Sequence, residues 1–227
     1  MFPNGRSLAS LRTTAGRRPE RQRGTCRWLL TLCVVAACSG KPAVKVPAAT
    51  TTAPDSFLVV FETSRGPITV QVNRDWSPHG ADRLNELVAS GFLSENRFFR
   101  VVPGFIAQFG LNDDKATNEA WDARTIPDDD FGHSNQHGTL VFAQNGPNTR
   151  SHQLFFNTGA NQRLDRQLFT PVGRVVGGMA AMDSIFSGYE ERPDQHLIRT
   201  LGNSYLARMF PKLDYVKSAR VEAFPPK

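Results

Sequence analysis

The residues FFRVVPGFIAQFG, Phe98–Gly110, give the clearest structural signal in this 227-residue chain. They form two short runs of aromatic and β-branched residues separated by Pro103-Gly104, a pattern that predicts two strands joined by a turn. One arginine, Arg100, stands among apolar residues here, and Gln108 follows in the second run. An arginine in such surroundings is either half of a structural ion pair or a functional donor, and its position alone leaves both readings open.

The runs on either side of this stretch predict a mainly β domain. The first two are joined by SRG, whose glycine indicates a hairpin turn. The predicted strands are 57–63, 67–73, 138–144, 153–159, 170–176 and 213–224. Many short strands with a few helices predict a closed antiparallel β-barrel whose open ends are covered by helices.

Three segments predict helices, and one long segment predicts none. The first helix covers 78–90, with Ser77 as N-cap and Pro78 at the first helical position. Its apolar face is made by Ala81, Leu84, Leu87 and Val88. Residues 178–188 predict a short helix, whereas the polar stretch 111–137 shows no clear period and predicts a loop insertion.

The third predicted helix, in 198–210, comes near the end of the chain. Pro211 ends it and Gly202 weakens it. Its expected apolar face comprises Ile198, Leu201, Tyr205, Leu206 and Met209.

The net charge of +6 lies in the first 37 residues. Seven arginines against Glu20 alone give 7 − 1 = +6 there, and the remainder holds 20 basic and 20 acidic residues. The rest of the chain is formally neutral, so the composition does not predict a basic face for nucleic acid.

The start of the chain predicts export. The apolar run Trp28–Ala37 has the length of a signal-peptide h-region and about half the length of a membrane-spanning helix. It leads into VAAC, Val35–Cys38, which resembles a bacterial lipobox. We therefore expect a lipoprotein-type signal peptide over 1–37, lipid on Cys38 and a location in the cell envelope. An uncleaved anchor or an ordinary signal cleaved nearby are the alternatives.

Residues 38–55 are rich in Pro, Ala and Thr and predict a flexible linker before a domain over 56–224. All three cysteines, Cys26, Cys33 and Cys38, precede that domain. Cleavage before Cys38 would leave one thiol, so we expect neither a disulfide nor a thiolate metal site in the mature chain.

Two blocks resemble the cyclophilin family. FFRVVPGFIAQFG is similar to the family's Phe-x-Arg-aliphatic-aliphatic-Pro-Gly-Phe-aliphatic-x-Gln signature. GTLVFAQNGPNTRSHQLFFNTG, Gly138–Gly159, is similar to its second motif, in the same order. The resemblance implies a barrel of about eight antiparallel strands capped by two helices, with an additional C-terminal helix here. It also implies peptidyl-prolyl cis–trans isomerase activity on proline-containing polypeptides, with no cofactor.

The resemblance assigns roles residue by residue. Arg100 matches the catalytic arginine, with Phe105 and Gln108 beside the substrate proline. The matching substrate-binding positions are Ile106 (usually methionine), Ala143 and Gln144 along the peptide backbone, Phe155 as the pocket floor and Leu164 as its wall, and Phe169. A shift of one residue would give the floor to Phe156 or replace Phe169 by Leu168.

Three positions depart from the family pattern. Phe99 and Phe169 stand where histidines are common, and Arg163 stands where many members have a tryptophan associated with cyclosporin binding. We expect activity to survive and cyclosporin sensitivity to be in doubt.

The chemistry explains why an arginine is needed. Partial double-bond character gives the amide a rotation barrier of about 18–20 kcal/mol. In the twisted transition state the prolyl nitrogen gains a lone pair, and a permanently charged guanidinium can donate to it.

Two alternative functions remain open from the sequence. One is a catalytically weak proline-binding chaperone or assembly factor, and the other is a structural envelope lipoprotein with a vestigial pocket. Nothing in the sequence demands more than a monomer.

Other site candidates carry weaker signals. His133, His137 and His152 lie close together in the sequence, but no spacing among them fits a zinc site. Asp128, Asp129 and Asp130 follow no calcium-binding pattern, and we expect them to be solvated loop charge.

Overall fold

The computed structural model describes residues 46–47, 50–130 and 132–224, all within one compact unit, Pro42–Lys227. The predicted signal peptide and Cys38, the predicted site of lipid attachment, lie outside the described residues. Among the helices of the described part, none combines the length and the apolar character needed to cross a membrane. Within the predicted linker, the backbone amides of Thr51 and Ala53 donate to Glu86 at 3.0 Å and to Asp82 at 2.8 Å.

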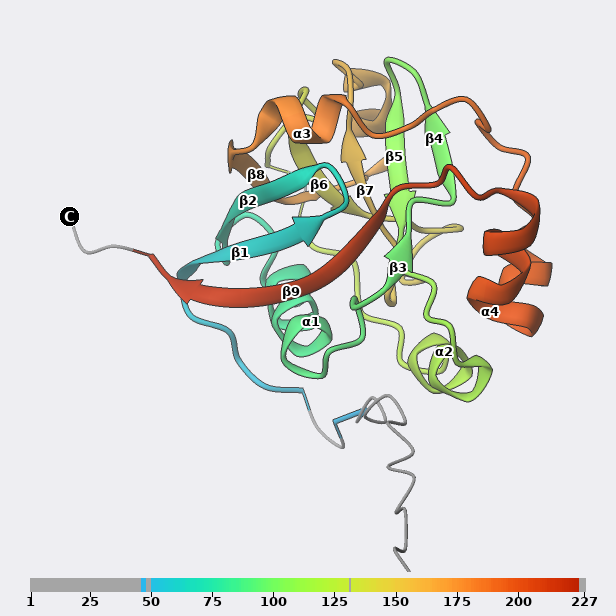
Figure 1. The fold of residues 1–227 in the computed structure, drawn as a ribbon. Helices are drawn as coiled ribbons and strands as arrows, with labels where there is room; N and C mark the ends of the chain where they lie inside the picture. The colour runs from blue at the N-terminus through green and yellow to red at the C-terminus, as the bar shows by residue number, and fades with distance from the viewer. Residues whose placement is uncertain (1–45, 48–49, 131, 225–227) are drawn as a thin grey trace, which may run out of the picture. The chain divides into compact units, whose positions relative to one another are not determined.

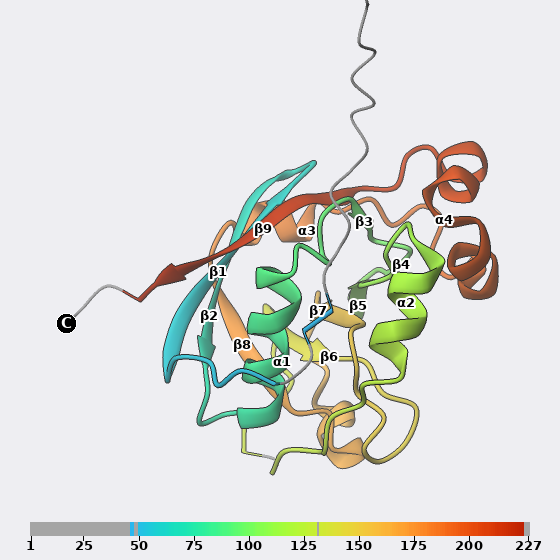
Figure 2. The same ribbon diagram turned by 90° about the horizontal axis from the view of Figure 1, so that it is seen from below.

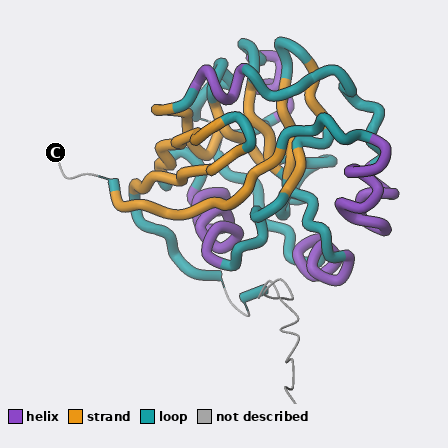
Figure 3. The backbone as a smooth tube through the Cα atoms, viewed as in Figure 1, coloured by secondary structure: helices purple, strands orange, loops and turns teal. Residues whose placement is uncertain are grey.

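The described residues contain one antiparallel sheet of nine strands (Figures 1 and 3). Its order is β3-β9-β1-β2-β8-β6-β7-β5-β4. The strands are β1 Ser56–Thr63, β2 Gly66–Asn73, β3 Asn96–Arg97, β4 Arg100–Val102, β5 Ile106–Phe109, β6 Thr139–Phe142, β7 Leu154–Asn157, β8 Pro171–Gly177 and β9 Tyr215–Ala223. The predicted hairpin is confirmed as β1-β2, with Gly66 at φ 114° in the turn, where glycine is favoured.

The sheet curls strongly. The ring of Phe61 on β1 lies 5.8 Å from Phe109 on β5 and 5.7 Å from Phe156 on β7. In a flat sheet these strands would stand about 20 Å apart, since neighbouring strands are spaced about 4.8 Å. The prediction of a mainly β, curled antiparallel fold is confirmed. The predicted closure is not seen, because the pairing of the described strands ends at β3 and β4, which are joined only through Phe98 and Phe99.

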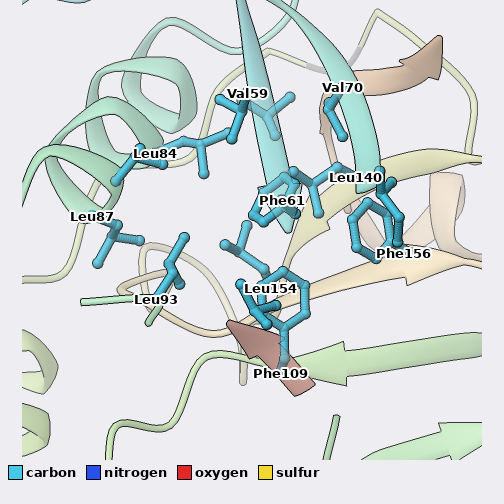
Figure 4. Close-up of a cluster of buried hydrophobic side chains, with 14 of the residues drawn as sticks. Val59, Phe61, Val70, Leu84, Leu87, Leu93, Phe109, Leu140, Leu154 and Phe156 are labelled. Carbon is cyan, nitrogen blue, oxygen red and sulfur yellow. The ribbon is translucent and has the colours of Figure 1, made fainter. Parts of the chain in front are cut away.

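Four α-helices accompany the described sheet (Figure 2). They are α1 Pro78–Ala89, α2 Lys115–Asp122, α3 Met179–Asp183 and α4 Gln195–Met209. Helix α1 directs the predicted face into the core, where Leu84 and Leu87 meet Val59 and Phe61 (Figure 4). Burial of such side chains contributes about 1.5–3 kcal/mol each.

Two predictions about helices are wrong. The polar stretch 111–137 is not only loop, because Asp114 caps α2 by accepting from the amide of Thr117 at 2.8 Å. In α4, Leu201 and Met209 are exposed rather than part of the buried face. Gly202, at φ 61° and ψ −150°, breaks the helical phase, so residues before and after it do not share one stripe.

The expected solvated role of Asp129 is also wrong. Its carboxylate accepts from the amides of His79 at 2.9 Å and Gly80 at 3.0 Å, and from the hydroxyl of Ser77. It therefore caps α1 from 50 residues away, and the side chain of the N-cap residue Ser77 makes no cap bond of its own. Arg150 pairs with the same carboxylate at 3.0 Å in a buried setting.

Candidate active site

The pleat of four neighbouring strands aligns the predicted residues. Across the sheet, Arg100 on β4 pairs with Gln108 on β5, Gln108 with Phe155 on β7, and Phe155 with Val141 on β6. Directly paired residues project from the same face, so these four side chains form one row. The two-residue repeat places Phe156 on the opposite face, in the main core. Of the two alternatives, Phe155 is the residue beside Arg100 and Gln108.

The guanidinium of Arg100 has two polar partners. Its Nη1 donates to Oε1 of Gln108 at 3.3 Å, and its Nε donates to Oε1 of Glu191 at 2.7 Å. Nη2 also contacts Glu191. The side chain is 28% exposed, so it is neither buried nor turned fully into solvent. Gln108 is fixed in turn, because its Nε2 donates to Oε1 of Gln153 at 2.8 Å.

An apolar cluster lies beside this polar group. Ile106, Val141, Phe155 and Leu164 are buried together, and Phe105, Ala143 and Phe169 pack against them. It is separate from the main core and contains seven residues, six of which were predicted for the site. An apolar surface next to a guanidinium raises the strength of any hydrogen bond made there, because water is excluded.

The turn after β4 places the ring of Phe105 close to two guanidinium groups. The guanidinium carbon of Arg100 lies 5.8 Å from its ring centroid, and that of Arg163 lies 4.2 Å away. The carbonyl oxygen of Phe105 accepts from the amide of Thr158 at 2.9 Å and from Nδ2 of Asn161 at 2.7 Å. These bonds fix the turn and so the position of the aromatic ring.

Phe169 rather than Leu168 belongs to the cluster. The ring of Phe169 meets that of Phe155 edge to face at 5.9 Å, whereas Leu168 is exposed and has φ 60°. Phe169 also borders an open hollow of about 260 Å³ that Gln144 and Gln167 line. Nε2 of Gln144 donates to the carbonyl of Gln167 at 3.0 Å, which fixes one wall of this hollow.

Phe99 contributes to structure. Its side chain is buried in a second cluster with Leu111, Ile198 and Leu206, which joins β4 to α4. The family often has histidine at this position. Here Phe99 occupies it and packs against apolar side chains of α4.

Three contributors to the site were missed from the sequence. Val141 lies in a predicted strand, and the alternation of side chains between the two faces of that strand is the signal that points to it. Gln153 precedes Phe155 by two residues and shares its face. Glu191 is 91 residues from Arg100, and no local pattern indicates that contact.

The three histidines are satisfied by neighbours. His152 is fully buried, with Nδ1 2.6 Å from the carbonyl of Gly110 and Nε2 2.7 Å from Asp122. His137 pairs with Asp183 at 2.7 Å, and His133 stacks on Trp76 at 3.9 Å. In the part of the chain that the structure describes, no group of three potential ligands converges to hold a metal.

Two carboxyl groups have lowered pKa values, the buried Asp129 and the exposed Asp122. Burial acts to raise the pKa of Asp129, but the hydrogen bonds from Ser77, His79 and Gly80 and the charge of Arg150 hold it below its usual range. Partial burial likewise acts to raise the pKa of Asp122, but the hydrogen bonds and charges of His152 and Arg199 hold it below its usual range. Both are ionised at neutral pH and serve as structural anchors outside the predicted site.

Comparison with known proteins identifies relatives. Residues 58–202 match the family described as "Cyclophilin type peptidyl-prolyl cis-trans isomerase/CLD". Peptidyl-prolyl cis-trans isomerase-like 3 of Gallus gallus is 28% identical over 134 residues, 57% of this chain and 81% of that protein. A probable peptidyl-prolyl cis-trans isomerase of Brucella abortus is 29% identical over 143 residues, 58% and 72% of the two chains.

One relative is much longer than the match. A peptidyl-prolyl cis-trans isomerase of Arabidopsis thaliana is 32% identical over 142 residues, which span 60% of this chain but 22% of that protein.

Among solved structures, a cyclophilin type isomerase of Cryptosporidium parvum aligns with a TM-score of 0.53 at 19% identity, covering 75% of this chain and 99% of that one. The same protein has been solved in the presence of the dipeptide Ala-Pro.

Proposed function

The chain belongs to the cyclophilin-type peptidyl-prolyl cis–trans isomerase family, and we propose from that premise that it catalyses rotation about X–Pro bonds with Arg100 as the essential donor. The observation that carries the proposal is the cross-strand row of Arg100, Gln108 and Phe155 next to a separate apolar cluster. An arginine, a fixed amide and an apolar surface are the groups that the chemistry requires, and they come together from three strands.

The proposed mechanism is differential binding of the twisted amide. When the X–Pro bond rotates, its nitrogen loses conjugation and becomes a hydrogen-bond acceptor. A guanidinium N–H directed at that nitrogen stabilises the twisted state and neither planar isomer, which is the condition for catalysis. A guanidinium carries only donors and no acceptor, so Arg100 can meet the nitrogen only as a donor.

The apolar cluster holds the substrate ring in this proposal. Phe155, Ile106 and Leu164 are the apolar side chains that we expect the pyrrolidine ring to contact, with the partly buried Phe105 and Phe169 at the border of the cluster. If the ring is held still, rotation occurs on the side of the residue before proline. Gln108 serves two purposes, since it contacts Arg100 and faces the same surface. Ala143 and Gln144 lie along the path proposed for the peptide backbone.

The magnitudes are compatible with this mechanism. Shortening an isomerisation of about 100 s to about 1 ms requires about 7 kcal/mol of transition-state stabilisation. One charge-assisted hydrogen bond in a water-poor site supplies about 2–4 kcal/mol. The remainder has to come from the apolar surface and from holding the chain in a twisted geometry.

We also propose a substrate class and a cellular location for the enzyme. The arginine-rich start, the apolar run Trp28–Ala37 and the motif ending at Cys38 support an exported, lipid-anchored enzyme. Its substrates would be proline-containing segments of envelope or secreted proteins, and its role would be to assist their folding. Replacing Cys38 by Ser is expected to release the protein from membranes upon fractionation, and continued attachment would contradict the lipid anchor.

The activity is tested with a prolyl isomerisation assay that uses no coupling protease, so that cleavage does not limit the rate. Arg100→Ala is expected to remove most of the turnover while the circular dichroism spectrum and the binding of a prolyl peptide persist. That result separates an enzyme from a proline-binding chaperone, for which turnover by the unmodified protein would be absent. Unchanged turnover in Arg100→Ala would contradict the assigned role.

A further inference from the structure

The segment between α3 and α4 carries a carboxylate to the proposed catalytic arginine. It runs beside β4 in Figure 1, where it is drawn in orange, and Val101 and Glu190 form an antiparallel bridge there. The amide of Val101 donates to the carbonyl of Glu190 at 3.2 Å. The next residue, Glu191, reaches the guanidinium of Arg100, which precedes Val101 on β4.

The residues around Glu191 are anchored. The ring of Tyr189 meets those of Phe186 and Phe210 edge to face, each at 5.1 Å. The guanidinium carbon of Arg192 lies 5.1 Å from the ring centroid of Tyr189, and its Nη2 donates to the carbonyl of Gly188 at 2.7 Å. Phe210 belongs to the cluster that fixes α4. Glu191 is thus delivered by a packed segment with fixed residues on both sides, and its position relative to β4 is set by the fold.

The contacts divide the guanidinium into used and free donors. An arginine has five N–H groups in one plane. Glu191 contacts Nε and Nη2 along one edge, and Gln108 accepts from Nη1. Three of the five donors therefore have a partner among the described residues, and two, one on Nη1 and one on Nη2, have none there. The two partners come from different elements, so together they fix both the position and the plane of the group.

We propose that Glu191 is a positioning residue for the isomerase reaction: it holds the plane of the Arg100 guanidinium beside the apolar cluster before substrate arrives. This inference rests on the proposed function. A free arginine side chain samples many rotamers. It loses this conformational entropy when it is restricted to the single rotamer that donates to the twisted bond. Prior fixation by Glu191 and Gln108 moves that loss of entropy from the catalytic step to folding.

The exposure of the pair argues against an inhibitory lock. The side chain of Glu191 is 60% exposed and that of Arg100 is 28% exposed, and ion pairs of this kind are weak and screened by salt. Such a pair biases the orientation of the arginine without preventing a substrate from reaching the two free N–H groups. We therefore expect its loss to affect kcat and to leave KM nearly unchanged.

The test compares Glu191→Ala and Glu191→Gln with a matched control. Glu62→Ala removes the carboxylate from another exposed arginine pair, Arg220–Glu62 at 2.7 Å, on β1 and β9 outside the proposed site. Glu191→Ala is expected to lower kcat about threefold, an effect of about 0.7 kcal/mol, at nearly constant KM. Glu191→Gln keeps an acceptor and is expected to recover part of the loss, and Glu62→Ala is expected to match the unmodified protein.

Salt supplies a second readout. Raising NaCl to about 1 M shortens the screening length to about 3 Å, so kcat of the unmodified protein should fall toward that of Glu191→Ala. The kcat of Glu191→Ala should barely respond to salt. Unchanged or increased turnover in Glu191→Ala would overturn the inference, and an increase would indicate an inhibitory contact instead.

A spectroscopic readout separates this inference from the proposed function. The side-chain Nε–H resonance of Arg100, assigned by its loss in Arg100→Ala, should be resolved in the unmodified protein and in Glu62→Ala. It should exchange rapidly with solvent in Glu191→Ala. If the unmodified protein shows no turnover, the proposed function fails, and this resonance still decides whether Glu191 holds the arginine. Equal exchange rates in the unmodified protein and Glu191→Ala would refute the positioning role.

Discussion

At the scale of single residues, Arg100 forms an ion pair and is also placed for the donor role that we propose for it. It forms an ion pair with Glu191, and it also faces an apolar cluster in register with Gln108 and Phe155. The two roles are compatible because a guanidinium donates along several edges. A structural partner on one edge leaves donors on another for chemistry.

The alternation of Phe155 and Phe156 gives a residue-scale prediction. Phe156→Ala empties a site in the main core and is expected to lower the free energy of unfolding by about 3–5 kcal/mol. Phe155→Ala removes the proposed pocket floor and is expected to reduce kcat/KM much more than Phe156→Ala does. Urea unfolding and isomerase kinetics of both variants, assayed while folded, check this. A larger kinetic loss in Phe156→Ala would mean that the floor is misassigned.

At the scale of elements, α1 begins where a distant loop supplies its cap. Asp129 satisfies the free amides of His79 and Gly80 and pairs with the buried Arg150. The local sequence suggested that Ser77 would do this, and the serine instead donates its hydroxyl to Asp129. The 111–137 stretch thus contributes to the fold through a helix and a capping carboxylate.

Replacing that carboxylate is the first element-scale prediction. Asp129→Asn keeps the size of the side chain but leaves Arg150 without its buried charge partner. We expect a loss of about 2–4 kcal/mol in the free energy of unfolding. Denaturant unfolding measures it, with Asp130→Asn as a control at an exposed neighbour. Equal stability of the two variants would show that the remote cap is unimportant.

The kink in α4 gives a second element-scale prediction. Gly202 has φ 61° and ψ −150°, a region used almost only by glycine. A Cβ there would lie 2.3 Å from Oδ1 and 2.5 Å from the carbonyl oxygen of Asp113. Gly202→Ala is therefore expected to destabilise the protein by about 2 kcal/mol or more. The melting temperature tests this against Gly132→Ala, whose added Cβ meets no atom within 4 Å; equal melting temperatures would contradict it.

At the scale of the described domain, two cores support the site from different sides. The main core fills the curled sheet, and a second cluster fixes α4 against β4 through Phe99. The same C-terminal segment brings Glu191 to Arg100. The environment of the proposed catalytic arginine therefore depends on a part of the chain that is far away in sequence.

Three carboxylates with lowered pKa values predict how the stability of the domain responds to acid. The pKa values of Asp82, Asp122 and Asp129 are lowered in the folded state, because their hydrogen bonds and arginine or histidine neighbours outweigh burial. The unfolded chain then binds more protons than the folded one near pH 4, so stability falls as the pH drops. We expect a nearly constant melting temperature at neutral pH and a decline below about pH 4. A melting temperature that rises on acidification would contradict this.

The candidate site residues in two continuous motifs came from the resemblance to a known family, and their roles are proposals. The sequence by itself predicted the fold class, most strands and the first helix. These features arise from local physics, since strand alternation, turn residues and helix caps are written within a few neighbouring positions. The choice between Phe155 and Phe156, by contrast, came from the register of β5, β6 and β7 in the structure.

Only the tertiary structure decided which distant residues meet. The cap of α1 by Asp129, the burial of Phe99 under α4 and the contact of Glu191 with Arg100 join positions that are 50 or more residues apart or on separate elements. Such contacts depend on how elements pack, and no local pattern encodes a partner across that separation. The phase change at Gly202 belongs here too, because Asp113, which is far away in sequence, lies where a Cβ on Gly202 would be.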